Sequence, residues 1–431
     1  MLGKIRYHIF WFADCFKKNS VKRYYREIRF LNEKFNSESA QILLKKYRKD
    51  LLSHAINTTS FYKEYYSKSF NELPVINKNI IRDNFNAFES ITYKRKQRYK
   101  VSTSGSTGTP FVTYLNKNKR LRNSADTIYF AEKSGFKVGD MLLYIRLWDD
   151  QHKKMSLTSW ILNIVSHNIS DLRDVDIEGL LSKIKNNKSP KGLLAYASAY
   201  DTICQYMDEN GSEPIDCNIK SVIAISERLT DYAKESMEKY FGVPVVSRYS
   251  ASETGILAQQ SINCDNFNIN WASYYVEILN FDNDEPAIEG EIGRIIITDL
   301  FNYSVPLIRY DTGDLGSMIV GDSNNGPVLT NVEGRKMDML YNTKGELISS
   351  HIVHKICLFK GIKQYQLIQK SEKEYIFKVN TSNEFKEEEG LVESYKKYFG
   401  DDSIISIEYV DNIPILSSGK RKKVINLYKK D

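Results

Sequence analysis

The sequence has few cysteines, and none of them lies in a pattern that would tie a fold together. Five cysteines are spread over 431 residues, and no two of them form a C-x-x-C pair. An odd number of widely spaced cysteines argues against a disulfide framework and a structural zinc site, and it favours a reducing compartment. We therefore expect a cytoplasmic protein. The cysteines are Cys15, Cys204, Cys217, Cys264 and Cys357.

Long apolar runs are also missing. No segment approaches the roughly 18 apolar residues that a membrane-spanning helix needs. The apolar run near the N-terminus, residues 9–12, lies between basic residues and is too short for a signal peptide, with Asp14 close behind it. We interpret it as part of a helix packed on its own domain, and the alternative is an interfacial amphipathic helix that touches a membrane.

The few histidines exclude several kinds of catalytic site. Six histidines are scattered along the chain, so no Ser/His/Asp constellation can be assembled. His351 and His354 have helical spacing, but no third metal ligand stands nearby. Basic and aromatic residues do not combine into a nucleic-acid module. We take the net charge of +7 as a mild excess spread along the chain, apart from its tail, which favours anionic ligands such as nucleotides.

The most distinctive stretch that is present reads S-T-S-G-S-T-G-T-P, over residues 102–110. It combines six hydroxyls with two glycines and carries no charge. Glycines allow a tight turn whose backbone N–H groups form a nest for an anion, and hydroxyls add donors. A β-rich run follows from Phe111, so a strand-loop-strand hairpin that cradles phosphate is predicted. A solvated polar loop is the alternative. A P-loop is excluded because no lysine follows the second glycine.

Elsewhere the pattern predicts an α/β protein of several domains. Residues 1–70 have helical periodicity, and Asn77 is a predicted N-cap for a helix over 78–88. Between about residues 123 and 246, short apolar runs alternate with helices of 10–15 residues, which is typical of parallel strands. From residue 270 the chain is strand-rich, with a predicted strand at 307–310 and a turn at 312–314. A linker is predicted at 333–336, before a small α+β domain.

Two of the predicted parallel strands end in polar sequences, and ligands of such sheets bind at these ends. One end carries Ser226 and Glu227, and the other is Y-S-A-S-E-T-G, residues 249–255. Glu253 lies just past its strand, which suits a Mg²⁺ held jointly with substrate phosphates. The alternative is a helix N-cap carboxylate. Tyr249 could cover a purine, although a tyrosine at a strand end is more often part of the core.

Three charged residues further along have candidate roles with plain alternatives. Asp314 follows a predicted glycine turn and could accept both ribose hydroxyls, or it could only make an Asx-turn. Arg335 is a cation at a predicted domain boundary or a solvated linker arginine. Lys420 lies in a Ser-Ser-Gly loop ahead of further basic residues, which usually indicates a solvated tail. A lysine on a mobile loop can also stabilise charge on a transferring group.

The order of these motifs resembles that of the adenylate-forming superfamily of acyl-CoA synthetases, peptide-synthetase adenylation domains and luciferases. The resemblance runs from about residue 60 to the C-terminus. Two further stretches, residues 73–78 and 290–314, look most like the phenylacetate–CoA ligase branch, which includes CapK-type proteins of capsular polysaccharide clusters. The ordered motifs are S-T-S-G-S-T-G-T-P (102–110), Y-S-A-S-E-T-G (249–255), R-Y-D-T-G-D-L-G (309–316), E-G-R-K-M-D-M-L (333–340) and P-I-L-S-S-G-K (414–420).

The resemblance implies the domain organisation and the reaction. An N-terminal helical region over 1–70 would precede a large domain over 71–334, with α/β layers and a β-subdomain, that binds ATP and the acid. A small mobile α+β lid domain over 335–431 would carry the catalytic lysine. A carboxylate would attack the α-phosphate of ATP, giving an acyl-adenylate and pyrophosphate, and a thiol or amine would then displace AMP.

The roles of individual residues are carried over from the resemblance. Tyr249 would stack on adenine, and Glu253 would bind Mg²⁺. Asp314 would bind the ribose hydroxyls with help from Arg335. Lys420 would bridge the acyl carboxylate and phosphate during adenylation. The loop at Ser104, Gly105, Ser106, Thr107, Gly108 and Thr109 would hold the β- and γ-phosphates, and further nucleotide contacts are expected from Ser226, Glu227, Ser250 and Ser252.

One departure and one ambiguity follow from the same resemblance. Many members have a lysine after the proline of the phosphate loop, whereas this chain has Phe111, so one phosphate contact is missing. The acyl acceptor is expected to be CoA, and the alternative is an amine of a surface-polysaccharide sugar or amino acid. A third alternative is a non-catalytic homologue that only binds nucleotide.

Overall fold

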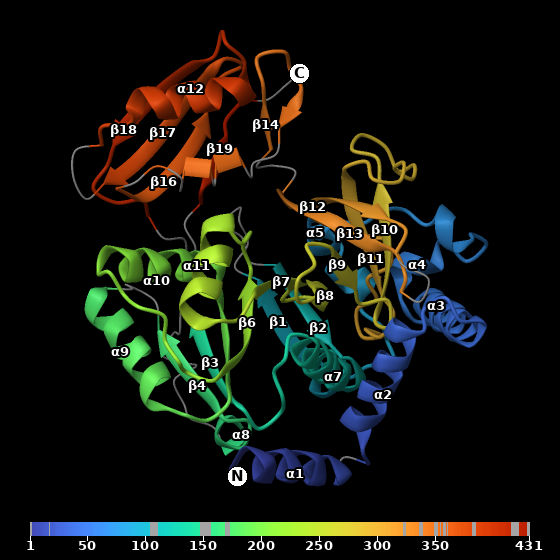
Figure 1. Cartoon of the computed structure of the whole chain (residues 1–431). Helices are drawn as coiled ribbons and strands as arrows, with labels where there is room; N and C mark the ends of the chain where they lie inside the picture. Colours follow the sequence, from blue (N-terminus) through green and yellow to red (C-terminus); the bar gives the residue numbers. More distant parts are fainter. Residues whose placement is uncertain are drawn as a thin grey trace. The chain divides into compact units, whose positions relative to one another are not determined.

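The computed structural model contains two compact units. One comprises residues 1–312 and 316–332, and the other comprises residues 313–315 and 333–431. The structure describes residues 2–16, 18–103, 111–146, 157–168, 173–321, 325–335, 339–348, 352–353, 355–356, 359, 361–381, 385–414 and 422–428. Figure 1 shows helices and a large sheet in the first unit, and a smaller sheet in the second.

The N-terminal region is helical, as predicted. It consists of α1 (Leu2–Cys15), α2 (Ser20–Glu33), α3 (Glu38–Thr58) and the short α4 (Ser60–Lys63), and the 3₁₀ turn Phe70–Glu72 follows. The sequence starts α2 in an unusual way, because its N-cap Asn19 makes no side-chain cap. The Asp14 carboxylate accepts from the backbone N–H groups of Val21 and Lys22 instead. The buried Asp14 therefore joins α1 to α2.

The segment before the predicted phosphate loop is partly as predicted. Asn77 caps α5 (Lys78–Asp83) by accepting from the backbone of Asn79 and Ile80. The helix predicted over 78–88 is interrupted at Asn84, and the short α6 (Phe85–Phe88) follows. After a 3₁₀ turn at Arg95–Gln97, β1 (Tyr99–Thr103) and β2 (Phe111–Leu115) pair antiparallel, which confirms the predicted hairpin.

The parallel half of the large sheet has the predicted alternation of strands and helices. Its strands are β3 (Met141–Arg146), β4 (Ile164–Asn168), β5 (Lys191–Tyr196), β6 (Ile219–Ile225) and β7 (Val245–Ala251). The helices are α7 (Lys117–Lys133), α8 (Leu157–Ile161), α9 (Asp174–Asn186), α10 (Ala197–Glu209) and α11 (Asp231–Phe241). Apolar residues of α9, α10 and α11 pack on alternate residues of these strands, such as Leu193 and Val222, because successive strand side chains point to opposite faces. The polar strand β4 had no predicted counterpart.

The antiparallel half completes a sheet of order β10-β11-β12-β13-β9-β8-β7-β6-β5-β3-β4. Its strands are β8 (Gly255–Gln260), β9 (Phe267–Ile269), β10 (Tyr274–Leu279), β11 (Gly293–Asp299), β12 (Tyr310–Ile319) and β13 (Val328–Arg335). Three predictions are wrong here. The strand predicted at 307–310 begins only at Tyr310, the turn predicted at 312–314 lies within β12, and the linker predicted from residue 333 overlaps the end of β13. Pairing with neighbouring strands decides these positions, whatever their turn-like composition.

The second unit has an α+β core. The strand pair β14 (Leu340–Tyr341) and β15 (Leu347–Ile348) stands apart from a sheet of order β18-β17-β16-β19. That sheet contains β16 (Ile362–Gln369), β17 (Glu374–Thr381), β18 (Ile404–Tyr409) and β19 (Val424–Asn426), and α12 (Glu388–Phe399) covers it. The rings of Tyr375 and Phe399 stack with centroids 3.8 Å apart, so α12 is fixed to the sheet by aromatic packing.

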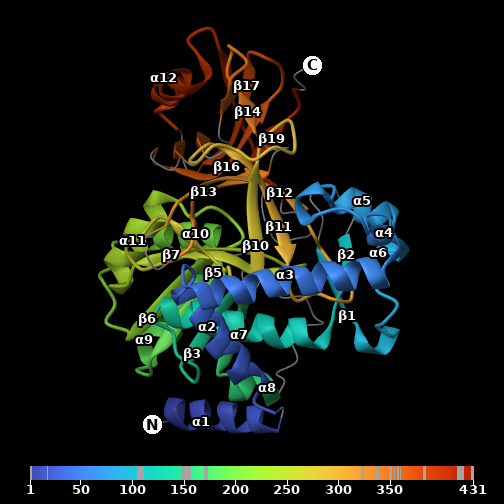
Figure 2. The same ribbon diagram turned by 90° about the vertical axis from the view of Figure 1, so that its right-hand side faces the viewer.

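A chain of buried charges links α7 to the antiparallel strands. Figure 2 shows α2, α3 and α7 on one side of the sheet. The Lys119 ammonium, fully buried, lies 2.8 Å from the Asp299 carboxylate and donates to the Tyr274 hydroxyl at 2.9 Å. Arg122 donates to the Ser273 hydroxyl, which in turn donates to Asp126. Since an unpaired buried charge is very unfavourable, these contacts fix α7 in one position.

We predict that Lys119→Met lowers the free energy of unfolding by about 3–5 kcal/mol, because Asp299 is left buried without its cation. Urea denaturation followed by circular dichroism measures the change. Lys46→Met is the matched control, since Lys46 pairs with Asp50 on the surface and such pairs contribute under about 1 kcal/mol. Equal effects of the two substitutions would contradict this account.

Candidate functional site

The best-defined polar site of the first unit is the turn between β7 and β8. Glu253 lies in this turn, and only 2% of its surface is exposed. The strand β8 begins at Gly255, so the alternative of a helix N-cap carboxylate is wrong for Glu253. Gly255 has a φ of +111°, and a Cβ there would meet the Asn123 side chain at 3.1 Å. Glycine therefore allows the turn to close tightly over α7.

The Glu253 carboxylate is held by groups from two other motifs. The Lys78 ammonium lies 2.9 Å from Glu253 Oε1, and the Tyr310 hydroxyl donates to the same oxygen at 3.0 Å. Tyr310 is buried, whereas about a third of the Lys78 side chain is exposed. A buried carboxylate is tolerated only when a cation and hydrogen-bond donors surround it. The site thus joins L-P-V-I-N-K, Y-S-A-S-E-T-G and R-Y-D-T-G-D at one oxygen atom.

Backbone pairing explains how Lys78 reaches this position. Ile76 forms an isolated parallel bridge with Tyr310. Its N–H donates to the carbonyl of Arg309 at 3.0 Å, and its carbonyl accepts from the N–H of Asp311 at 2.7 Å. Asn77 then caps α5, which makes Lys78 the first residue of the helix. Lys78 is thereby placed beside the start of β12.

Arg309 also anchors the segment that precedes α5. Its backbone has a φ of +50°, in the left-handed region that a non-glycine residue rarely adopts. Its guanidinium donates to the carbonyls of Asn71 and Leu73 at 2.9 and 2.8 Å. Burial raises the pKa of the neighbouring Glu277 carboxyl, although Arg309 acts in the opposite direction. These contacts stabilise the unusual backbone of Arg309, which explains why β12 starts at the next residue, Tyr310.

Lys78 also lies beside the residue that departs from the family pattern. Its ammonium is 6.0 Å from the centroid of the Phe111 ring, which is buried at the start of β2. A cation therefore stands next to the end of the phosphate-loop motif, although the loop itself has no lysine. The sequence did not single out Lys78, because the residues around it indicate only a helix start.

The turn that carries Glu253 is connected by hydrogen bonds to the buried charges of α7. The Tyr274 hydroxyl, which accepts from Lys119, donates to the carbonyl of Thr254 at 2.5 Å. Thr254 N–H donates to the carbonyl of Ala251 at 3.3 Å. The position of Glu253 is thus coupled to the α7 network through two hydrogen bonds.

The two strand ends predicted to bind nucleotide have different local structures. Ser226 is exposed and has a φ of +71°, a strained backbone of the kind often found at functional sites. Glu227 accepts from the N–H of Ser198 at 3.1 Å, in the first turn of α10. Tyr249 is half-buried against the core, and the register of β7 and β8 shifts between Tyr249 and Ser250. Such bulges redirect side chains near binding sites. Ser252 is exposed in the turn.

The structure describes only some of the remaining predicted site residues. Asp314 lies within β12, half-buried, directly after Gly313 with its φ of +83°. Arg335 is the last residue of β13, and its side chain lies outside the described residues. The loop residues 104–109 and Lys420 also lie outside them. Their roles remain predictions.

Arg248 is a buried cation that no sequence pattern singled out. It precedes Tyr249 on β7, and burial lowers the pKa of its guanidinium to about 10. Arg248 Nε donates to Gln259 at 2.7 Å, whereas Nη2 has no hydrogen-bond partner within the part of the chain that the structure describes. Tyr144 and Tyr196 lie with Val246 in the apolar cluster on one face of the parallel strands. No carboxylate among the described residues pairs with this guanidinium.

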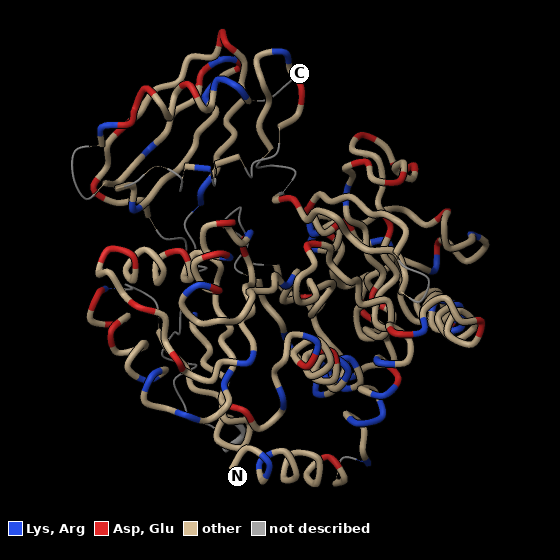
Figure 3. The backbone as a smooth tube through the Cα atoms, viewed as in Figure 1, with Lys and Arg blue, Asp and Glu red and all other residues tan. Residues whose placement is uncertain are grey.

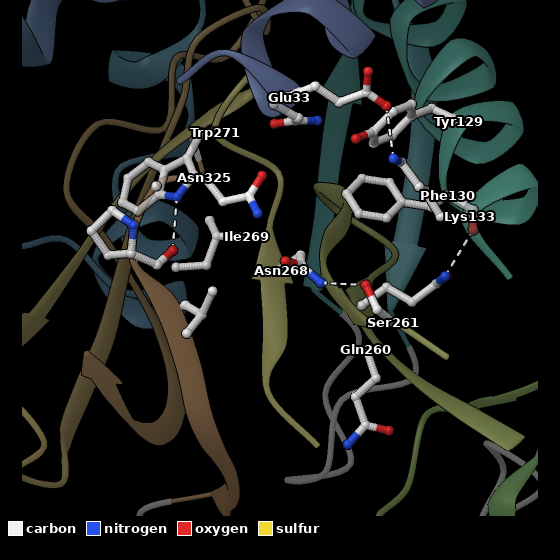
Figure 4. A pocket seen from close by; sticks show the side chains of 15 residues that line it. Glu33, Tyr129, Phe130, Lys133, Gln260, Ser261, Asn268, Ile269, Trp271 and Asn325 are labelled. Atoms are coloured by element: carbon white, nitrogen blue, oxygen red, sulfur yellow. Dashed lines mark hydrogen bonds and ion pairs between the residues drawn. The ribbon is translucent and has the colours of Figure 1, made fainter. Parts of the chain in front are cut away.

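A small cavity of about 100 Å³ lies elsewhere in the first unit, and Figure 4 shows it. Its walls come from α2, α7, β8 and β9 and from residues 325–328. The polar groups of the wall pair among themselves, as in the Glu33–Lys133 ion pair at 2.7 Å. Trp271 donates to the carbonyl of Pro327 at 2.9 Å. None of the predicted site residues that the structure describes lines this cavity.

Comparisons with known proteins agree with the motif order. Residues 340–427 match the family model described as CapK C-terminal domain. The chain is 24% identical to Protein CapK of Staphylococcus aureus over 95% of this chain and 94% of CapK. It is 23% identical to the phenylacetate-coenzyme A ligase of Escherichia coli K12 over 41% of each chain. The predicted resemblance to the adenylate-forming superfamily, in its phenylacetate–CoA ligase and CapK branch, is confirmed.

Solved structures of this superfamily share the fold. A 2-hydroxyisobutyryl-CoA ligase in the postadenylation state, in complex with R3-HIB-AMP, superimposes with a TM-score of 0.69 at 15% identity, over 90% of each chain. ATP-bound MatB of Rhodopseudomonas palustris gives a TM-score of 0.56 at 15% identity, over 75% of this chain and 66% of MatB. The predicted α/β fold class is confirmed, and the comparisons together point to an AMP-forming ligase.

Proposed function

We propose that the protein is an ATP-dependent carboxylate ligase that activates an acid as acyl-AMP and then transfers the acyl group to CoA. The observation that carries this proposal is the meeting of three superfamily motifs at Glu253, where Lys78 and Tyr310 contact one carboxylate oxygen. Superfamily likeness alone indicates a fold, whereas this arrangement keeps the charged groups that phosphate chemistry needs.

The donor set fits a Mg²⁺ ion. Magnesium usually takes one or two protein carboxylates and completes its coordination with water and substrate phosphates. Glu253 is one buried carboxylate at the carboxyl end of a strand, with both of its described contacts on Oε1. When bound there, the ion would neutralise charge on the phosphates. Tyr310 would keep the carboxylate oriented.

Lys78 supplies the positive charge that the phosphate loop lacks. It pairs with Glu253 at 2.9 Å, next to Phe111. A metal ion bound to the Glu253 carboxylate would compete with the Lys78 ammonium for its negative charge. The ammonium is partly exposed and flexible enough to turn toward an anion. We infer that it turns to the leaving pyrophosphate. This role replaces the contact that other members make through a lysine of the loop.

The other roles follow the superfamily pattern and are part of the proposal. Residues 104–109 bind the β- and γ-phosphates, Tyr249 stacks on adenine, and Asp314 with Arg335 binds the ribose. Ser226, Glu227, Ser250 and Ser252 border the nucleotide. Lys420 bridges the acid and the α-phosphate, where fixed positive charge lowers the barrier by stabilising the transition state.

We predict that Lys420→Ala reduces acid-dependent pyrophosphate release by at least about a hundredfold while ATP binding changes little. The assay incubates the protein with ATP, Mg²⁺, hydroxylamine and a broad panel of acids. Lys422→Ala is the matched control, because it removes a charge from the same basic run. Full activity of Lys420→Ala would disprove its role, and no acid-dependent release by the wild type would disprove the proposed function.

We predict that Lys78→Met lowers kcat/KM for ATP by about a hundredfold, since one donor to developing phosphate charge is lost. Pyrophosphate exchange at varied ATP concentrations measures this effect. Lys68→Met is the control, because Lys68 pairs with the exposed Glu72 on the nearby surface. Unchanged kinetics in Lys78→Met would show that this lysine is only a structural partner of Glu253.

Arg248 indicates the class of acid. A buried guanidinium that has no carboxylate partner among the described residues is costly, so an anionic ligand would compensate it. The tyrosines of the adjacent cluster, Tyr144 and Tyr196, supply hydroxyl groups and ring surface on the same face of the sheet. We infer that the acid carries a second anionic group, which pairs with Arg248 Nη2.

We predict that the enzyme prefers a dicarboxylic acid to the matching monocarboxylic acid, and that Arg248→Met reduces this preference by at least about tenfold. The ratio of kcat/KM values for matched pairs of acids measures it. A monocarboxylic acid that remains a good substrate for the variant shows that the fold and the ATP site are intact. A preference that is equal in wild type and variant would contradict the role of Arg248.

One comparison favours an acyl acceptor other than CoA. Similarity to CapK extends over 95% of the chain, whereas similarity to the E. coli phenylacetate-coenzyme A ligase covers 41%. An amine of a surface-polysaccharide sugar or amino acid is therefore the alternative to CoA. Mass spectrometry of reactions with CoA or with amine acceptors separates a thioester from an amide.

A further inference from the structure

The N-terminal helix exposes a continuous apolar stripe. Five large apolar side chains of α1 and the residue after it are exposed, from 40% for Ile9 to 79% for Phe16. The other three are Leu2, Ile5 and Phe12. Their spacing alternates between three and four residues, so at about 100° per residue they lie within an arc of about 80°. One face of α1 is therefore almost entirely apolar and faces solvent.

The stripe is not the face by which α1 packs on the protein. Asp14 is buried and caps α2, and the Trp11 ring lies 6.1 Å from that of Tyr25. Gly3 approaches the backbone of Gly139, where a Cβ at Gly3 would lie 3.2 Å from the carbonyl oxygen. These residues define the inner face of the helix. The interpretation of residues 9–12 as packed on their own domain thus accounts for only one side of α1.

Positive charge is concentrated around this helix, contrary to the even spread expected from the sequence. Residues 1–30 contain eight Lys and Arg and two acidic residues, which gives +6 of the net +7. Asp14 is one of the two acidic residues and is buried, whereas Lys18, Arg23 and Arg26 are exposed. Figure 3 shows the basic positions along α1 and α2. The apolar stripe therefore belongs to a strongly basic part of the chain.

An exposed tryptophan adds to the same surface. Trp160 of α8 is 55% exposed, and the Arg6 guanidinium lies 5.5 Å from the centroid of its ring. Tryptophan prefers the boundary between water and lipid, and arginine binds anionic headgroups there. No helix in the described part of the chain is long and apolar enough to cross a bilayer.

We propose that α1, together with Trp160 and the basic residues of α2, docks the protein on the surface of an anionic lipid bilayer. The apolar stripe enters the boundary between headgroups and acyl chains, and the surrounding cations pair with lipid phosphates. The helix lies in the plane of the membrane. This inference is independent of the proposed ligase activity.

The position of α1 leaves the candidate site accessible. Gly3 contacts Gly139 just before β3, so α1 lies at the edge where the parallel strands begin. Ser226 and Glu253 follow β6 and β7, at the edge where these strands end. The strands separate the two edges by about 20 Å. A bilayer bound at α1 would lie at the opposite end of the parallel strands from Glu253.

Sedimentation with lipid vesicles tests the proposal. The full-length protein is expected to sediment with vesicles of equal parts phosphatidylglycerol and phosphatidylcholine, and at least about tenfold less with pure phosphatidylcholine. Added salt should weaken the binding. Phe12→Asn with Phe16→Asn should lower binding to anionic vesicles by at least about tenfold. No binding of the wild type to anionic vesicles would overturn the proposal.

Matched variants distinguish lipid binding by the stripe from self-association and from a general loss of apolar surface. Ile288→Asn with Val320→Asn removes two apolar residues of similar exposure elsewhere and should bind vesicles like the wild type. Sedimentation velocity without lipid detects a second copy on the stripe, and a dimer broken by the Phe12 and Phe16 substitutions would overturn the lipid assignment. Pyrophosphate release should be the same in the wild type and in both double variants, so failure of this proposal leaves the ligase proposal untouched.

Discussion

A buried carboxylate is stable only beside a cation and hydrogen-bond donors, and Glu253 meets this condition through Lys78 and Tyr310. Two further contacts position the residues of this site. The bridge between Ile76 and Tyr310 brings the segment before α5 to the start of β12. The hydrogen bond from Tyr274 to Thr254 fixes the turn after β7. The ion pair thus joins segments that lie far apart in the sequence.

Two lysine–carboxylate pairs have different roles, one in the stability of the fold and the other in the proposed chemistry. Lys119 and Asp299 are fully buried and paired, so they support the turn without access to solvent. Lys78 is partly exposed, and its partner is a carboxylate suited to Mg²⁺. The first pair can remain intact throughout a reaction, whereas the second can exchange its partners. In the proposed function, Lys78 would take the place of the lysine that is missing after the predicted phosphate loop.

The sequence predicted the elements whose pattern is strong. The alternation of strands and helices and the hairpin of β1 and β2 follow from periodicity. The strand predicted at 307–310 was wrong because Arg309 adopts a left-handed backbone held by distant carbonyls. The turn predicted at 312–314 was wrong because β12 has strand neighbours on both sides. Tertiary pairing overrides turn-like composition at such positions.

The candidate site was predictable to a similar extent. Glu253 could be selected because it follows a strand in a polar motif. Lys78 and Arg248 could not be selected, because one looks like an ordinary helix start and the other like an ordinary strand residue. Their significance comes from contacts and burial that only the folded chain creates. The concentration of positive charge in residues 1–30 was missed, because the net charge was taken as spread along the chain, and the exposure of the apolar stripe of α1 could not be predicted from the sequence.

The exchange of partners by Lys78 is the central claim, and a crystal structure with Mg²⁺ and a non-hydrolysable ATP analogue tests it most directly. The account predicts Mg²⁺ on the Glu253 carboxylate and the Lys78 ammonium within hydrogen-bond distance of a β- or γ-phosphate oxygen. A structure in which the nucleotide is bound while Lys78 and Glu253 stay paired, with no metal ion on the carboxylate, would contradict it.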